Sequence, residues 1–311
     1  MRNDKRVVGI EIGGSKLQAV AGTAAGRVDQ TVRESANRDG GAVAIRQQVQ
    51  QMVKSLLAEH PAEAIGIGFG GPVDGVTGRV IKSHHVDGWE DFSLATWVGE
   101  TFGLPCRVSN DTDAAALAEA VVGAGRGKRR TFYTNIGSGI GGGLVEAGKL
   151  FTGRGGAMEF GHTWSYSPML GRWGRVEHLC SGWAIADRAR AMLAERRIGL
   201  LPVLCDGDID SIDAELVADA WQCLDPTAAQ LMGDVIDAYS HALCSVVALL
   251  NPDIVVIGGG FALVGQPLFT ALERAVADHV FEPFADNFTI VPAALGEQSV
   301  PVGALLLAAE A

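Results

Sequence analysis

The apolar residues of the chain fall into two kinds of pattern. Short, nearly continuous apolar runs that end in a glycine turn or in polar residues are typical of strands buried in a sheet. Such runs occupy residues 7–12, 64–69, 106–109, 132–136 and 254–257. Longer segments repeat apolar residues every three to four positions, which predicts helices over residues 42–59, 114–122, 184–196, 214–223, 227–250, 267–279 and 302–309. Strands that alternate with helices predict an α/β fold.

The opening of the chain excludes one common α/β fold. The first strand leads through a turn at residues 13–16 into a second strand over residues 17–22. A dinucleotide-binding fold would begin with a strand, a helix and a parallel strand instead. A second hairpin is predicted around Gly148, between strands over residues 144–147 and 149–151.

Composition and charge narrow the class of protein further. A chain of 311 residues, of which 48% are hydrophobic and 20% charged, can form a sizeable core. Its length suits two lobes of about 150 residues each, with the best boundary at the composition shift over residues 123–130. The net charge is −11 and the dense basic stretch at residues 126–130 is short, so we expect no nucleic-acid or anionic-membrane binding.

Cysteine usage and targeting signals predict a cytoplasmic protein. The five cysteines form no C-x-x-C pair, which favours a reduced compartment. No signal peptide and no apolar stretch of about 18 residues is apparent, so we also expect no membrane span.

Four glycine turns, each placed directly after an apolar run, are the first candidates for chemistry. They lie at residues 13–14, 70–71, 137–143 and 258–260. Glycine turns expose backbone N–H groups that can cradle phosphate, so four of them at strand ends predict a nucleotide in a cleft between two lobes. Two turns match the pattern G-x-G-x-x-G, but a turn and a strand follow them where the dinucleotide fingerprint needs a helix. Gly13-Gly14-Ser15-Lys16 lacks the Gly-Lys pair and the helix of a P-loop.

Several short motifs, taken together, resemble the ROK sugar kinases of the hexokinase–actin–Hsp70 superfold. They are Glu11-Ile12-Gly13-Gly14-Ser15-Lys16, Asn110-Asp111, the run 137–143, Glu159-Phe160-Gly161-His162 and Gly258-Gly259-Gly260. The resemblance implies a two-lobed actin-like ATPase (ribonuclease H-like) fold with an interdomain cleft. It implies one lobe over residues 1–123, completed by a helix at 300–311, and a larger lobe over residues 124–299. It also implies a homodimer.

The resemblance implies an ATP-dependent carbohydrate kinase that transfers the γ-phosphate to a hydroxyl of a hexose or hexose derivative, by the family's habit the 6-hydroxyl. Asp111 matches the catalytic aspartate, which would accept the proton of the attacking hydroxyl. A helix N-cap is the alternative reading of an aspartate at this position. The residues implied to bind the sugar are Gly70, Gly71, His85, Asn110, Asp111, Glu159, His162 and Glu177.

The same resemblance assigns residues to ATP and Mg²⁺. They are Glu11, Gly13, Gly14, Ser15, Lys16, Gly137, Ser138, Gly139, Gly258, Gly259 and Gly260. Glu11 stands where most members carry an aspartate of the Mg²⁺–phosphate shell, so the carboxylate is kept with one extra methylene. Lys16 is either a phosphate contact or a flexible surface lysine.

The sequence departs from the family at its zinc site and at one sugar position. The family's segment C-x-C-G-x-x-G-C-x-E is matched by residues 168–177, where Pro168, Leu170 and Arg175 replace the three cysteines. We therefore expect no structural zinc, and we expect Leu170, Trp164 and Trp173 to pack behind His162 in its place. His85 stands where the family usually has asparagine, so it either changes the sugar preference or is an exposed loop residue.

Two alternatives to an ATP-dependent kinase remain. One is a non-catalytic sugar sensor of the same family, which would carry a DNA-reading helix-turn-helix before the first phosphate loop. Six residues precede Val7, so we expect no such module here. The other is a kinase that uses polyphosphate, which would need a basic groove; residues 126–130 are its single candidate.

Overall fold

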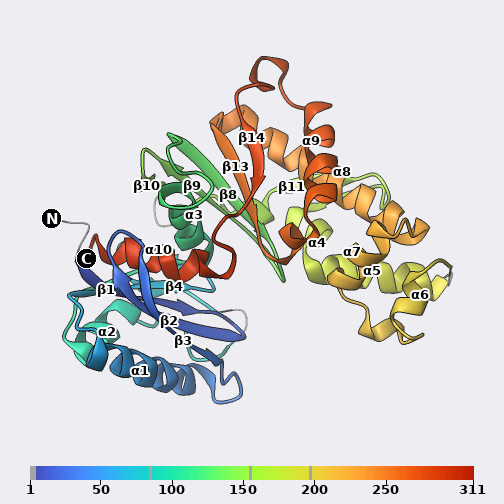
Figure 1. Ribbon diagram of the computed structural model, residues 1–311. Helices are drawn as coiled ribbons and strands as arrows, with labels where there is room; N and C mark the ends of the chain where they lie inside the picture. Colours follow the sequence, from blue (N-terminus) through green and yellow to red (C-terminus); the bar gives the residue numbers. More distant parts are fainter. Residues whose placement is uncertain (1–4, 84–85, 154–155, 196–197) are drawn as a thin grey trace. The chain divides into compact units, whose positions relative to one another are not determined.

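The computed structural model describes residues 5–83, 86–153, 156–195 and 198–311, and it divides into two compact units (Figure 1). The first unit comprises Met1–Arg129, Gly143–Met158 and Ala294–Ala311, and the second comprises Arg130–Gly142 and Glu159–Ala293. Residues 124–129, residues 294–299 and the segment 143–158 differ from the expected lobes, because they group with the first unit. A Cβ on Gly143 would lie 2.5 Å from Cβ of Ala116, so this segment passes directly against the helix that carries Ala116.

The first unit is built on a five-stranded sheet in the order β3-β2-β1-β4-β7. Its strands are β1 (Arg6–Ile12), β2 (Lys16–Thr23), β3 (Val28–Ser35), β4 (Ala64–Phe69) and β7 (Cys106–Asn110). β1, β4 and β7 are parallel, whereas β1, β2 and β3 form an antiparallel meander. The short strands β5 (Val73–Asp74) and β6 (Arg79–Val80) form a separate pair. β4 is buried along its whole length, which explains its continuous apolar run.

Helices cover both faces of this sheet (Figure 1). α1 (Gly41–Glu59) and α2 (Leu94–Phe102) lie on one side, and α3 (Asp111–Val121) and α10 (Ser299–Ala308) on the other. Small residues let α10 approach closely, since a Cβ on Gly66 would lie 1.9 Å from the carbonyl oxygen of Ala304. A Cβ on Gly303 would lie 1.8 Å from the carbonyl oxygen of Ala114. The alanine-rich sequence of α3 therefore reflects tight packing between helices.

The second five-stranded sheet has the order β10-β9-β8-β13-β14. Its strands are β8 (Arg130–Ile136), β9 (Ile140–Glu146), β10 (Lys149–Leu150), β13 (Ile254–Gly258) and β14 (Thr289–Pro292). β13 is parallel to both β8 and β14. The helices of the second unit are α4 (Val176–Cys180), α5 (Gly182–Glu195), α6 (Leu201–Leu204), α7 (Ala214–Gln222), α8 (Pro226–Leu250) and α9 (Gln266–Ala277). A small hairpin, β11 (Trp164–Ser167) with β12 (Arg172–Arg175), contacts α8.

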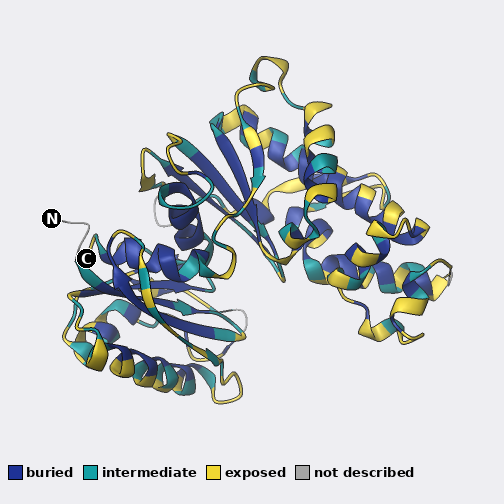
Figure 2. Cartoon of the chain, viewed as in Figure 1, coloured by how far each residue is buried: buried dark blue, intermediate teal, exposed yellow. Residues whose placement is uncertain are grey.

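One expectation about apolar segments was wrong. α8 is long and apolar enough to cross a membrane, with a mean hydropathy of 1.3 over 18 residues, although the sequence appeared to contain no such stretch. Of these 18 residues, 56% are buried inside the protein, and the buried side of α8 can be followed in Figure 2. Leu231, Val235 and Tyr239 are fully buried there, and Asp234 forms an ion pair with Arg188. α8 is thus a core helix of the second unit, and core helices can be as long and apolar as a membrane span.

Candidate active site

In the first unit, the candidate residues gather at the carboxyl ends of three parallel strands. Ile12 of β1 pairs with Phe69 of β4, and Phe69 pairs with Asn110 of β7, so the three strands end side by side. Asp111 follows β7 directly, and a Cβ on Gly70 would lie 3.4 Å from its Oδ2. The backbone after β4 therefore passes against the carboxylate of Asp111. This edge is where α/β sheets usually bind ligands.

Asn110 holds the start of α3 and leaves Asp111 in the first turn of the helix. Its Oδ1 accepts from the backbone N–H of Thr112 at 2.8 Å, and its Nδ2 donates to the carbonyl of Gly71 at 3.0 Å. Oδ1 of Asp111 also accepts from Thr112, at 2.7 Å. The N-cap is thus Asn110 and not Asp111, which removes the alternative reading of Asp111 as a simple cap.

Glu11 is a largely buried carboxyl group at the same edge, with 13% of its side chain exposed. Nζ of Lys16 lies 3.6 Å from its Oε1, whereas its Oε2 is buried and has no hydrogen-bond partner among the described residues. Burial raises the pKa of Glu11 from 4.5 to about 7; the charge of Asp111 adds to this rise, and Lys16 opposes it. Lys16 therefore lies beside a carboxylate and is not simply a free surface lysine. A buried carboxylate oxygen without a partner suits a hard cation such as Mg²⁺.

The raised pKa of Glu11 predicts a pH-dependent stability. The folded state keeps the proton up to about pH 7, so the stabilisation by the neutral group is complete below pH 4.5 and is lost as the pH rises through 7. Glu11→Gln mimics the neutral group at every pH. We expect it to stabilise the ligand-free protein by up to about 3 kcal/mol at pH 8 and by almost nothing at pH 4.5. Thermal unfolding at both values measures this, with exposed Glu63→Gln as control. An equal shift at both values would contradict it.

In the second unit, two of the glycine turns lie at one edge of the sheet. Asn135 of β8 pairs with Gly258 of β13, so the turns that follow these parallel strands are neighbours. A Cβ on Gly259, where φ is +81°, would lie 2.3 Å from the carbonyl oxygen of Ile136. Only glycine fits this close approach. The candidate nucleotide residues at 137–139 and 258–260 are thus brought together although they lie far apart in the sequence.

Glu177 is attached to the first of these turns. Its Oε2 accepts from the backbone N–H of Ile140 at 3.0 Å, and a Cβ on Gly139 would lie 2.8 Å from the same oxygen. The turn is further fixed by the N–H of Gly182, which donates to the carbonyl of Gly137 at 2.8 Å. A residue predicted to bind sugar therefore contacts a turn predicted to bind phosphate.

The Glu159–His162 segment is fixed by its two central residues. Phe160 is buried, with its ring 5.6 Å from that of Phe132 and 5.3 Å from that of Tyr239. A Cβ on Gly161 would lie 2.2 Å from the carbonyl oxygen of Ile140, so this glycine lets the turn lie against β9. The side chains of Glu159 and His162 remain exposed on either side.

The side chain beside His162 is not one that the sequence predicted. Trp164, Leu170 and Trp173 are 63%, 36% and 64% exposed, so the expected packing behind His162 was wrong. Nη1 of Arg175 lies 3.5 Å from Nδ1 of His162 instead. A guanidinium can only donate, so a hydrogen bond between the two side chains requires Nδ1 as the acceptor and leaves Nε2 free to donate. Arg175 occupies a cysteine position of the family motif, and this replacement was the one sign in the sequence that Arg175 has a role near His162.

A pocket of about 690 Å³ opens next to the two glycine turns of the second unit. It is lined by α5, α7 and the turn at 260–264, and its lining includes Ser138, Trp183, Arg190, Glu215, Asp219 and Phe261. Its size and its mixture of an indole with charged groups suit a nucleoside. The sequence did not identify the lining residues from α5 and α7, because helix periodicity gives no sign of a ligand. His85, a predicted sugar residue, lies outside the described residues.

Comparisons with known proteins agree with this arrangement. A glucokinase of Thermotoga maritima is 28% identical over 304 residues, which are 96% of each chain. A ROK family glucokinase from Streptomyces griseus, solved in complex with glucose and AMPPNP, is 27% identical, with a TM-score of 0.80 over 98% of this chain and 100% of that chain. A putative xylose repressor of Caldicellulosiruptor sp. is 27% identical over 70% of this chain and 55% of that protein.

The structural likeness confirms the predicted actin-like ATPase fold class, with its two sheets of five strands. The family model described as the ROK family matches residues 7–311, which is nearly the whole chain. This chain therefore belongs to the ROK family.

Proposed function

We propose that the protein is an ATP-dependent sugar kinase that transfers the γ-phosphate to a hydroxyl of a hexose or hexose derivative, the 6-hydroxyl by analogy with the family. The observation that carries this proposal is the placement of Asp111 beside the turn at Gly70, at the carboxyl edge of three parallel strands. Family membership and the likeness to glucokinases support it.

Asp111 is the general base of the proposed reaction. Its carboxylate takes the proton of the sugar hydroxyl as that oxygen attacks the γ-phosphorus, and the bond to the bridging oxygen of ADP breaks. Glu11 is the residue that would hold Mg²⁺, directly or through water, and the metal would neutralise charge on the phosphates. Lys16 already lowers the pKa of Glu11, and a bound cation would lower it further. The carboxyl group can therefore lose its proton when the cation binds.

The second unit supplies groups for the sugar and the nucleotide. Nε2–H of His162 can donate to a sugar hydroxyl, and the carboxylates of Glu159 and Glu177 can accept from neighbouring hydroxyls. The N–H groups of the glycine turns can bind phosphate, and the adjoining pocket can bind the nucleoside. Gly13, Gly14 and Ser15 form the corresponding turn in the first unit, closed by the bond from the N–H of Gly13 to the carbonyl of Lys16 at 3.0 Å.

Trp183 provides a test of nucleotide binding in this pocket. Its indole lines the pocket and is 46% exposed, so it can stack on a base. We expect Trp183→Ala to raise the KM for ATP about 10-fold, because base–aromatic stacking contributes about 1–3 kcal/mol. The KM for sugar should stay within about twofold. Phe281→Ala, which removes an exposed aromatic ring outside the pocket, is the control. An unchanged KM for ATP in Trp183→Ala would place the nucleoside elsewhere.

The proposed function itself is tested by ADP release from Mg²⁺–ATP in the presence of glucose, fructose, mannose, allose, N-acetylglucosamine or N-acetylmannosamine. We expect release that depends on one class of sugar. Inorganic polyphosphate in place of ATP tests the other phosphoryl donor, and we expect it to support less turnover. The proposal fails if ATP binds but none of these sugars stimulates ADP release.

A non-catalytic sugar sensor is the second candidate, and the similarity to a putative xylose repressor favours it. A sensor would bind sugar without turnover. Calorimetric binding of sugar together with undetectable ADP release would therefore support the sensor over the kinase.

A further inference from the structure

The zinc centre implied by the family does not fit the residues of this chain. In the described part of the chain, no three residues of the types His, Cys, Asp and Glu are grouped so that they could hold a metal ion. Cys180 is fully buried, its Sγ lies 3.6 Å from the carbonyl oxygen of Val235, and burial raises the pKa of the thiol. A zinc ligand must be a thiolate, and Cys180 is held as a thiol.

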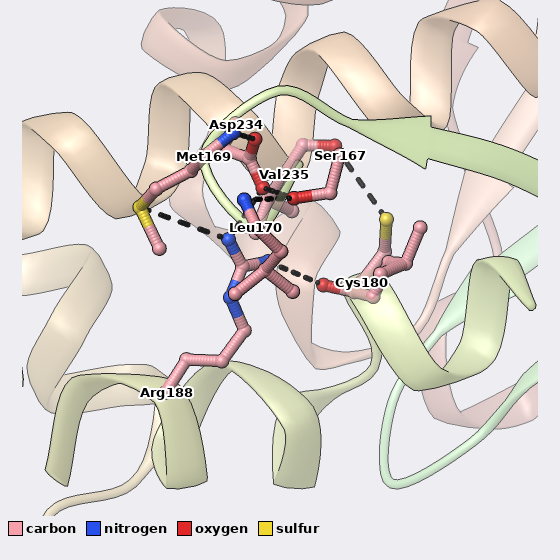
Figure 3. Close-up of polar contacts among 8 residues, drawn as sticks. Ser167, Met169, Leu170, Cys180, Arg188, Asp234 and Val235 are labelled. Carbon is pink, nitrogen blue, oxygen red and sulfur yellow. Dashed lines mark hydrogen bonds and ion pairs between the residues drawn. The ribbon is translucent and has the colours of Figure 1, made fainter. Parts of the chain in front are cut away.

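A buried polar network holds the same segment instead (Figure 3). Its centre is Asp234 of α8, whose Oδ2 accepts from the hydroxyl of Ser167 at 2.6 Å. Its Oδ1 accepts from the backbone N–H of Met169 at 2.7 Å, and the hydroxyl of Ser167 accepts from the N–H of Leu170 at 3.1 Å. One carboxylate thus fixes the tip of the β11–β12 hairpin, which is where the family places two of its cysteines.

Arg188 of α5 connects this network to α4. One guanidinium nitrogen forms an ion pair with Oδ2 of Asp234, and the other donates to the carbonyl of Leu179 at 2.9 Å. The side chains of Arg188 and Asp234 are only 10% and 4% exposed. A buried ion pair needs further hydrogen bonds around it, and Ser167, Met169 and Leu179 supply them, although Nε of Arg188 is buried without a partner among the described residues. The short helix α4 that it fixes carries Glu177.

The face of β11 that carries Ser167 contacts α8 along the rest of the hairpin as well. Ser165 alternates with Ser167 along β11, and its hydroxyl donates to the carbonyl of Ala238 at 2.7 Å, one helical turn beyond Asp234. Both serines are buried. The base of the hairpin carries Arg175, which contacts His162. Fixing the hairpin therefore also fixes the partner of His162.

We propose that the network of Asp234, Arg188 and Ser167 replaces the zinc centre as the support of the sugar site, with Asp234 as a positioning residue for His162 and Glu177. That the supported site binds a sugar rests on the proposed function. Asp234 acts through the hairpin and α4 and does not itself touch the reacting groups.

Asp234→Asn tests the proposal, because it keeps the side-chain shape but leaves the buried cation of Arg188 without its anion. We expect the KM for sugar to rise at least about 10-fold and to rise more than the KM for ATP, which should change only as far as Glu177 shifts the turn at Gly139. Ser167→Ala removes one hydroxyl and should raise the KM for sugar by about threefold. Asp237→Asn removes an exposed carboxylate from the same helix and should change neither value. A lower melting temperature with an unchanged KM for sugar would overturn the proposal.

Hydrogen exchange and zinc analysis separate this proposal from the proposed function. We expect Asp234→Asn to speed amide exchange in residues 159–180, compared with Asp237→Asn, even if the protein phosphorylates none of the sugars tested. Should Asp234→Asn not fold, the same comparison is made with Ser167→Ala. We also expect a metal chelator to leave melting temperature and exchange unchanged. About one tightly bound zinc per chain, or unchanged exchange in the hairpin of both variants, would overturn the proposal.

Discussion

Replacing Asp111 with asparagine is expected to lower kcat for sugar-dependent ADP release by about 10³-fold, the scale of a lost general base. An amide cannot take the proton of the attacking hydroxyl. Its oxygen can still accept from the N–H of Thr112, which the carboxylate does at 2.7 Å, so α3 should begin as before. The KM values for sugar and ATP should therefore change by less than about threefold. Steady-state kinetics measure all three quantities.

The charge of Asp111 gives this variant a second readout. Because that charge helps to raise the pKa of Glu11, Asp111→Asn should lower the pKa of Glu11. The fall in stability between about pH 4.5 and 7 should then become smaller. Asp91→Asn, at an exposed carboxylate paired with Arg79, is the matched control and should change neither activity nor this pH dependence. If Asp111→Asn kept more than a tenth of the wild-type kcat, Asp111 would not be the general base.

The features that the sequence predicted well are those encoded within a few residues. Continuous apolar runs that end in glycine predicted β1, β4, β8 and β13, because strands covered on both faces need apolar residues at every position. The helix over 42–59 was confirmed as α1, and its apolar residues Ile45, Val49, Met52, Val53 and Leu56 are all buried. The turns at 137–139 and 258–260 were both predicted to bind the nucleotide, and the parallel pairing of β8 with β13 brings them together, although nucleotide binding there stays a prediction.

The features that were missed depend on neighbours that are distant in the sequence or on weak local patterns. β3 alternates exposed and half-buried residues at the edge of its sheet, so it lacks the apolar run of a central strand. β11 and β12 form a hairpin whose aromatic face is exposed. The sequence did not indicate that its serines are buried, because they bond to α8, which is distant in the sequence. Arg188 and Asp234 are 46 residues apart, and no local spacing indicates that they pair.

A buried carboxylate in α3 organises the backbone around it in the first unit. Glu119 is completely inaccessible to solvent. Its Oε2 accepts from the N–H groups of Ala124 at 2.9 Å and Ala294 at 3.0 Å. Its Oε1 accepts from the N–H of Leu295 at 2.8 Å and the hydroxyl of Ser299 at 3.1 Å. Glu119 thus joins the end of α3 to the segment that leads into α10, which packs on the sheet beside Asp111.

Glu119→Ala is therefore expected to lower the free energy of unfolding by about 3–5 kcal/mol, because three backbone N–H groups would lose their acceptor inside the protein. Glu119→Gln keeps one acceptor oxygen but turns an NH₂ group toward N–H donors, so it should cost about 2–3 kcal/mol. Equilibrium urea unfolding measures both values, with exposed Glu100→Ala of α2 as control. A loss below about 1 kcal/mol in Glu119→Ala would mean that water satisfies these donors, and that the carboxylate is not what fixes α10 to the sheet.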